Sequence, residues 1–152
     1  MSLSCIINQK NEPLLNCSTS SYITDAIEVM VRTGRNALAI FNAEKELSGI
    51  LTFFDVIKAI NSVGMKGIDF HDLKVKNWMT AKVISVQVSS KLTDALKLMG
   101  QHKIHHLAVK DGEVLLGLIS ISDILAQIQH DDALEISVLR DMARAKLVTD
   151  IA

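Results

Sequence analysis

The feature that most restricts the fold of this chain is an internal repeat. Residues 24–30 (TDAIEVM) return as residues 93–99 (TDALKLM), and residues 49–55 (GILTFFD) return as residues 117–123 (GLISISD). The two pairs are separated by nearly the same number of positions, 69 and 68. A repeat of this length is one supersecondary unit used twice. We therefore expect an α+β chain built from two similar units.

Each copy predicts the element order β-α-β-β-α. In the second copy, Thr93 is predicted to cap a helix with Asp94 in its first turn, and Asp111-Gly112 is typical of a tight turn between strands. The strand after this turn is apolar throughout, which favours burial on both faces. In the first copy we expect strands 14–17, 37–41 and 46–51, a helix 24–33 that ends at Gly34 and a helix 52–63 that ends at Gly64. In the second copy we expect strands 83–88, 104–109 and 114–119 and a closing helix 120–129.

These elements divide the chain into four parts. Unit 1 covers residues 10–64, a connector covers residues 65–78, and unit 2 covers residues 79–130. The segment 131–152 is predicted to form an amphipathic helix outside the repeat, with aspartates at its start and basic residues near its end, as the helix dipole favours. Its apolar stripe consists of Leu134, Val138, Met142 and Ala145.

Composition excludes several classes of protein. Of the 152 residues, 49% are hydrophobic, which supports a sizeable core. The net charge of −1 lacks the basic excess of a nucleic-acid-binding protein. The sequence contains no apolar run long enough to span a bilayer, and its start lacks the features of a secretory signal. With two cysteines, Cys5 and Cys17, we expect free thiols and a cytoplasmic protein.

A hydroxyl and a carboxylate recur at the closing turn of each unit. Thr52 with Asp55, and Ser120 with Asp123, follow a strand and open a helix. One interpretation is a helix-capping box. The other is a nucleotide site, because a helix start binds phosphate and a carboxylate can accept hydrogen bonds from the two hydroxyls of a ribose. The repetition of the pattern at matching positions favours the second interpretation.

The ordered set of motifs resembles a tandem pair of cystathionine β-synthase (CBS) domains, also called a Bateman module. The resemblance rests on residues 75–80 (VKNWMT), on residues 104–109 (IHHLAV) and on the closing motif 117–123, and it covers roughly residues 10 to 130. It implies two βαββα units packed about a pseudo-twofold axis. It also implies that AMP, ADP, ATP or S-adenosylmethionine binds as a regulatory ligand in the clefts between the units, with no other cofactor required.

The resemblance implies specific ligand-binding residues in two clefts. In one cleft, Asp123 would hold ribose and Ser120 phosphate, while the base would lie against Ile84, Ser85, Val86, His106, Leu107 and Ala108. In the other cleft the matching residues are Asp55 and Thr52, with Asn16, Cys17, Ala37, Leu38 and Ala39.

The chain departs from the family pattern at a few positions. Alanine (Ala39 and Ala108) stands where the middle strand of the family often has proline, and Lys10-Asn11 replaces a Met-Thr lead-in. Phe53 and Phe54 beside Thr52 are expected to narrow or close the first cleft. The Ser120–Asp123 cleft is therefore the preferred one.

No motif predicts catalysis or metal binding. The chain has no Gly-x-Ser-x-Gly, HExxH or P-loop sequence, so we do not expect an enzyme. His105 and His106 are adjacent in a predicted strand and point to opposite faces, which argues against a shared metal ion. Lys103 and Arg35 are candidate partners for phosphate.

Two functions remain open. The first is a sensor of adenosine nucleotides that acts on a regulated protein partner. The second is a non-catalytic structural or interaction module that dimerises without a ligand. In both, we expect a homodimer.

Overall fold

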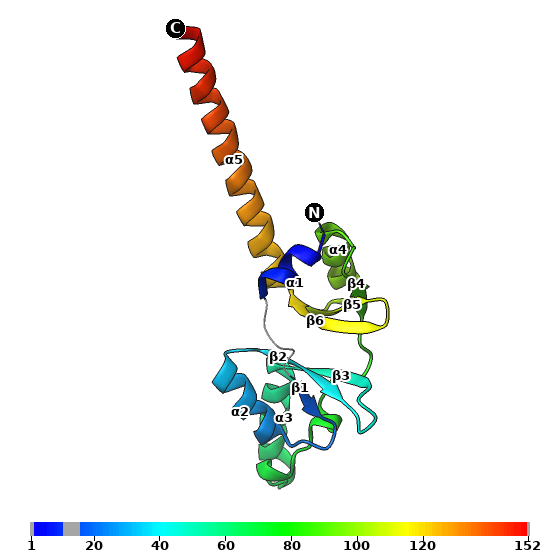
Figure 1. The fold of residues 1–152 in the computed structure, drawn as a ribbon. Coiled ribbons are helices and arrows are strands. Elements are labelled where there is room, and N and C mark those ends of the chain that lie inside the picture. The colour runs from blue at the N-terminus through cyan, green and yellow to red at the C-terminus, as the bar shows by residue number, and fades with distance from the viewer. Residues whose placement is uncertain (1, 11–15, 152) are drawn as a thin grey trace.

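The computed structural model describes residues 2–10 and 16–151, and it contains one three-stranded sheet for each copy of the repeat (Figure 1). In each sheet the central strand pairs parallel with the first strand and antiparallel with the third. The strands are β1 (Asn16–Ser18), β2 (Ala37–Phe41) and β3 (Leu47–Thr52), then β4 (Ser85–Gln87), β5 (His106–Asp111) and β6 (Val114–Ser120). The helices of the units are α2 (Ile23–Thr33), α3 (Phe53–Lys66), α4 (Leu92–His102) and α5 (Ile121–Ile151). The predicted fold, two βαββα units about a pseudo-twofold axis with a C-terminal helix, is confirmed.

Each unit has its own hydrophobic core between its sheet and its helices. Leu38 and Ile40 of β2 are fully buried in the first core, and Leu107 and Val109 of β5 are fully buried in the second. Successive strand residues face opposite sides of a sheet. The alternate residues of the central strands therefore face away from these cores, toward the side on which β2 and β6 are in contact.

A short helix that the sequence analysis did not predict, α1 (Ser4–Lys10), precedes the first unit but packs on the second. Leu3, just before this helix, and Ile6 within it are buried in the second core. The backbone N–H of Leu3 donates a hydrogen bond to the carbonyl of Ser90 at 3.0 Å. The apolar spacing of Leu3, Ile6 and Ile7 was the signal for this element.

The segment between the units precedes the second unit but packs on the first. It contains two short 3₁₀ helices, η1 (Phe70–Asp72) and η2 (Val75–Asn77). Leu73 and Val75 are buried in the first core. The backbone of Thr80 pairs with that of Ile50 in β3 through two N–H···O bonds of 2.9 and 3.0 Å. Each unit is thus completed by the segment that precedes the other.

Two helices begin earlier than predicted. Thr93 is not an N-cap: α4 begins at Leu92 after the capping position Lys91, and α2 begins at Ile23. The side chains of Leu92 and Ile23 are buried in their cores, so packing places the helix start one residue before the threonine. The carboxylate of Asp25 accepts a hydrogen bond from the backbone N–H of Tyr22 at 2.9 Å.

Other element boundaries also differ from the prediction. Helix α3 continues through Gly64 and ends before Gly67, which has a left-handed backbone (φ 63°) that glycine adopts without strain. Strand β6 is not buried on both faces, because Val114 is 63% exposed. Strands β1 and β4 are shorter than predicted, and residues 14 and 15 of the first predicted strand lie outside the described residues.

The predicted helices 120–129 and 131–147 are one continuous helix, α5, which projects away from both units (Figure 1). Its first turns pack in the second core through Ile124. Beyond His130 its described side chains are exposed almost without exception, including Leu134, Val138 and Met142. Among the described residues, no helix has the length and apolar character needed to cross a membrane.

Candidate functional site

The larger of two notable cavities lies between the two units and has a volume of about 550 Å³. One side is the start of α3, where Thr52 and Asp55 follow β3. The other side comes from the second unit, through Ile84 before β4 and His106 at the start of β5. We call this the Thr52 cavity. Its remaining lining residues are Asn36, Ile50, Phe53, Phe54, Lys58, Thr80, Lys82, Val83, Lys103, Ile104 and His105.

A capping box forms the polar corner of the Thr52 cavity. Asp55 Oδ2 accepts hydrogen bonds from the backbone N–H of Thr52 at 2.9 Å and from its hydroxyl at 3.1 Å. The Thr52 hydroxyl accepts one from the backbone N–H of Asp55 at 3.3 Å. Asp55 is only 7% exposed. Because a carboxylate has about four acceptor positions, this box leaves Asp55 with capacity for a further donor.

The lining of the Thr52 cavity is cationic. Lys58, Lys82 and Lys103 all contribute to it, against the single carboxylate of Asp55. The Lys58 ammonium lies 4.7 Å from the centre of the Phe54 ring, a distance at which a cation is attracted to the ring face. Phe53 and Phe54 line the cavity and leave it open, so they do not close this cleft as expected from the sequence.

His106 belongs to the lining of the Thr52 cavity and carries a buried, unsatisfied polar atom. Its Nε2 is buried and has no hydrogen-bond partner in the described structure. Burial lowers the pKa of His106, and the positive charges of His105 and Lys10 act in the same direction, against the opposing effect of Asp123 and Asp55. The ring is therefore mainly neutral near pH 7, with one nitrogen that donates and one that accepts a hydrogen bond.

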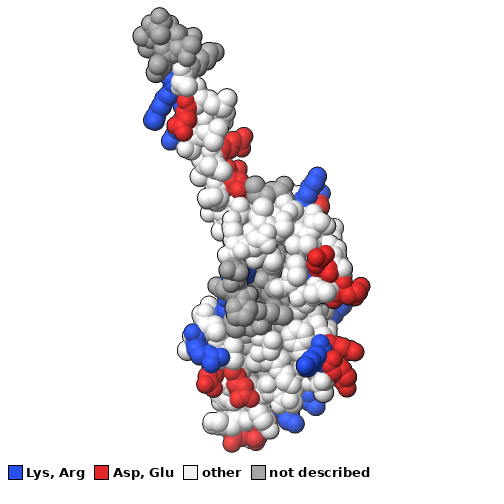
Figure 2. All heavy atoms as spheres, viewed as in Figure 1, with Lys and Arg blue, Asp and Glu red and all other residues white. Residues whose placement is uncertain are grey.

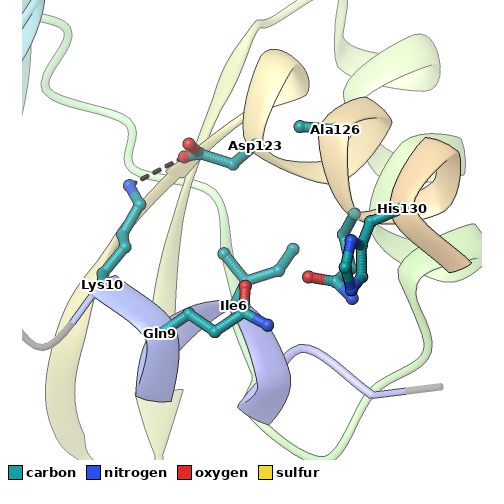
Figure 3. Close-up of a pocket in the computed structure, with 7 residues that line it drawn as sticks. Ile6, Gln9, Lys10, Asp123, Ala126 and His130 are labelled. Atoms are coloured by element: carbon teal, nitrogen blue, oxygen red, sulfur yellow. Dashed lines mark ion pairs between the residues drawn. The ribbon is translucent and has the colours of Figure 1, made fainter.

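The second closing turn has the same capping box but a different environment. Asp123 Oδ2 accepts from the backbone N–H of Ser120 at 2.8 Å, and Ser120 Oγ accepts from the backbone N–H of Asp123 at 3.1 Å. The same Oδ2 lies 2.7 Å from the ammonium of Lys10, at the end of α1 (Figure 3). Lys10 is therefore a site residue that the sequence analysis treated only as a departure from the family motif.

The surroundings of Asp123 hold it in the ionised form. Burial alone would raise the pKa of Asp123, but the hydrogen bond from Lys10, the backbone hydrogen bond of Ser120 and the charge of Lys10 outweigh it and lower the pKa. A cavity of about 350 Å³ lies between α1 and α5 at this point. We call it the Asp123 cavity; Ile6, Gln9, Lys10, Asp123, Ala126, Gln127 and His130 line it (Figure 3).

The structure distributes the other candidate site residues between the cores and the surface. Cys17, Leu38, Val86 and Leu107 belong to the cores, where their side chains pack within their own units. Ala39 and Ala108 are fully buried on the opposite faces of their sheets, and Ala37 is half-buried. Asn16 and Ser85 are exposed.

The buried cysteine, Cys17, does not have the environment of a reactive thiol. Cys5 and Cys17 are free, as predicted. Burial, followed by the nearby charge of Asp25, raises the pKa of Cys17 and disfavours the nucleophilic thiolate. Within the described ranges, no cluster of three or more His, Cys, Asp or Glu side chains could hold a metal ion.

Comparisons with protein sequences identify matches in both halves of the chain. The family model of the CBS domain matches residues 10–62 and residues 75–130. An uncharacterised 33.4 kDa protein of Thermofilum pendens is 30% identical over 116 residues, covering 76% of this chain and 37% of that protein. The mitochondrial CBS domain-containing protein CBSX3 of Arabidopsis thaliana is 28% identical over 127 residues, covering 81% of this chain and 60% of that protein. The chain thus spans less than two thirds of the length of each of these relatives.

Solved structures show the same architecture. A putative signal-transduction protein with CBS domains from Burkholderia ambifaria is 29% identical, with a TM-score of 0.75 over 86% of this chain and 96% of that one. The CBS domain pair of protein MJ0100, crystallised with 5-methylthioadenosine and S-adenosyl-L-methionine, is 19% identical. Its TM-score is 0.72 over 86% of this chain and 98% of that one, a likeness of fold.

Proposed function

Because this chain belongs to the CBS domain family, we propose that it is a regulatory module that binds an adenine nucleotide in the Thr52 cavity. The observation that carries this proposal is the cavity itself. Its volume of about 550 Å³ lies within the range of small-molecule sites. It also combines a helix start, a carboxylate and apolar strand ends from both units.

Each part of a nucleotide has a chemically suitable group in this cavity. The positive end of the α3 dipole and the hydroxyl of Thr52 suit a phosphate, although the N–H groups of Phe53 and Asp55 are already bonded to Asn36 and Thr52. Asp55 can accept from ribose hydroxyls, as acidic residues do in dinucleotide sites. Ile84 and Ile104 offer an apolar surface to the base, and the His106 ring belongs to the same lining.

The charge of the cavity favours a phosphorylated ligand. Protein MJ0100 was crystallised with S-adenosyl-L-methionine, which carries a positive sulfonium. In this chain Lys58, Lys82 and Lys103 would repel a sulfonium and attract phosphates. We therefore infer AMP, ADP or ATP as the ligand class in preference to S-adenosylmethionine.

An isothermal titration with matched ligands tests this proposal. We expect affinity to rise from adenosine to AMP and ATP, since each phosphate adds a favourable interaction with the lysines, and to fall with added salt. S-adenosylmethionine should bind more weakly than AMP. Absence of heat for all four ligands up to millimolar concentration would contradict the proposal, and tighter binding of S-adenosylmethionine would contradict the inferred ligand class.

A ligand at this place would join elements of both units, and this is the physical basis of the proposed regulation. A ligand shifts a conformational equilibrium only when it binds one state more tightly than the other. A nucleotide that contacts α3 in the first unit and the strand ends of the second would favour the arrangement in which they are close. The module would act on a protein partner through this shift, without catalysis.

A second candidate function, a dimerisation or interaction module, is favoured by α5. Leu134, Leu139 and Met142 are each at least 57% exposed on this projecting helix. The surface of the helix is largely uncharged in the view of Figure 2. Most helices are stable in proteins because an apolar face packs against another element, so α5 requires a partner to bury its apolar residues.

Truncation after Gln129 tests whether that partner is a second copy of the chain. We expect the full chain to be a dimer and the truncated chain a monomer, because the truncation removes the exposed apolar residues of α5. Light scattering measures both masses. A matched variant, Arg140→Ala with Arg144→Ala, keeps the apolar residues and should remain dimeric. An unchanged mass after truncation would contradict a role of α5 in dimerisation.

A further inference from the structure

One ion pair connects the N-terminal helix to the closing turn of the second unit. Lys10 Nζ lies 2.7 Å from Asp123 Oδ2 and also donates to the carbonyl oxygen of Leu118 at 3.0 Å. The side chains of Lys10 and Asp123 are 23% and 28% exposed, so the pair is shielded from most of the solvent. Figure 3 shows Lys10 reaching from the end of α1 to the carboxylate.

Within residues 2–10 and 16–151, no cation forms an ion pair with Asp55 at the equivalent place in the first unit. The repeat offset of 69 residues places Met79 where Lys10 stands, and an added Cβ at Gly49 would lie 2.7 Å from Met79 Sδ. Met79 thus packs against the strand backbone. The carboxylate of Asp55 accepts a hydrogen bond from the backbone N–H of Thr52, and the carboxylate of Asp123 accepts the equivalent bond from the backbone N–H of Ser120. The two closing turns therefore have the same box and differ in their lead-in residue.

We propose that Lys10 determines which of the two closing turns accepts a ribose, by neutralising the carboxylate of Asp123. This inference rests on the proposed function and deepens it. Lys10 and the backbone N–H of Ser120 both contact Oδ2 of Asp123, as the backbone N–H and hydroxyl of Thr52 both contact Oδ2 of Asp55, so the two carboxylates differ in charge compensation. The ammonium neutralises the carboxylate of Asp123 and leaves it a weaker acceptor for ribose hydroxyls than an unpaired carboxylate, because a hydrogen bond to an ionised acceptor is the stronger kind. Asp55 carries no such restriction, so the Thr52 cavity binds first.

Substitution of Lys10 tests this proposal in the full-length chain. Lys10→Met keeps a chain of similar length without the charge, and Lys10→Arg is the matched control that keeps the charge. Titration with AMP should give one site per chain for the wild type and for Lys10→Arg, and two sites per chain for Lys10→Met. Lys10→Met combined with Asp123→Asn should return the count to one.

A measurement without ligand shows whether the ion pair itself exists in solution. The carboxyl carbon of Asp123, followed by NMR during an acid titration, should have a higher pKa in Lys10→Met than in the wild type. The Lys10→Arg variant should keep the lower pKa. An unchanged pKa in Lys10→Met would overturn the proposal, since Asp123 would then not be held by Lys10.

The possible failures are distinguishable. One AMP site in both the wild type and Lys10→Met would overturn this inference and leave the proposed function intact. Two AMP sites per chain in the wild type would also overturn this inference and leave the proposed function intact. Absence of AMP binding by all variants would overturn the proposed function and this inference together.

Discussion

Replacement of Asp55 by alanine is expected to abolish nucleotide binding while the protein stays folded. Among the described residues, Asp55 is the only carboxylate that lines the Thr52 cavity, and two hydrogen bonds from a ribose to a charged acceptor contribute about 1.5–3 kcal/mol each. Their loss corresponds to a drop in affinity of at least about a hundredfold. Titration calorimetry with ATP on the purified variant measures this effect.

The repeat supplies an internal control for the Asp55 variant. Asp123→Ala removes the same capping interaction from the equivalent helix, worth about 1 kcal/mol, and also the ion pair with Lys10, so it should lose at least as much free energy of unfolding as Asp55→Ala. Only Asp55→Ala should lose nucleotide binding. Equal loss of binding in both variants, or a retained affinity in Asp55→Ala, would contradict the assignment of the ribose to the Thr52 cavity. Urea unfolding of both variants confirms that they are folded.

The repeated fold was predictable because its signals are local. The alternation of apolar residues and the Asp111-Gly112 turn belong to segments whose structure is set by their own neighbours in the chain, and the structure confirms the element order. The start of α2 was predicted one residue too late and the capping position of α4 two residues too late, because core packing of Ile23 and Leu92 decides these boundaries. Tertiary packing of this kind is not visible in a capping pattern.

The composition of the cavities was much less predictable. The sequence analysis grouped candidate residues by repeat copy, but the Thr52 cavity combines Thr52 and Asp55 of one unit with Ile84 and His106 of the other. The contact of Lys10 with Leu118 crosses 108 positions. Both arrangements arise because the segment that precedes each unit packs on the other unit. No local sequence pattern indicates this packing. Lys82 was missed for the same reason, since it lies in the segment that follows the pairing of Thr80 with β3.

The segment that precedes the second unit packs closely on β3 at Gly49. We therefore expect a single added methyl group to have its largest effect on stability at this position. A Cβ at Gly49 would lie 2.8 Å from the carbonyl oxygen of Thr80 and 2.7 Å from Met79 Sδ. The carbonyl belongs to the backbone pairing of Thr80 with Ile50, so it cannot move without loss of those hydrogen bonds. Overpacking of this kind typically lowers the free energy of unfolding by about 1–3 kcal/mol. We expect Gly49→Ala to lie at the upper end of this range, because the atom it meets belongs to the backbone of Thr80.

Gly117 provides the matched control because it occupies the equivalent position in the second unit. An added Cβ there would lie 3.5 Å from Ile7 Cδ1, an ordinary contact with the end of a flexible side chain. We therefore expect urea unfolding to show a large loss of stability for Gly49→Ala and a change below about 1 kcal/mol for Gly117→Ala. Similar losses in both variants would contradict the close approach of the lead-in to β3.

The same substitution should also weaken nucleotide binding, although Gly49 does not line the Thr52 cavity. The segment displaced by the new methyl group continues directly into Lys82 and Ile84, which do line it. A shift of this segment would move a phosphate partner and a base contact together, while Asp55 and the start of α3 stay in place. ATP titration of folded Gly49→Ala should therefore show reduced affinity, with Gly117→Ala close to the wild type. If Gly49→Ala is destabilised but binds ATP with unchanged affinity, the position of the segment from Met79 to Ile84 does not affect binding, and its proposed role is contradicted.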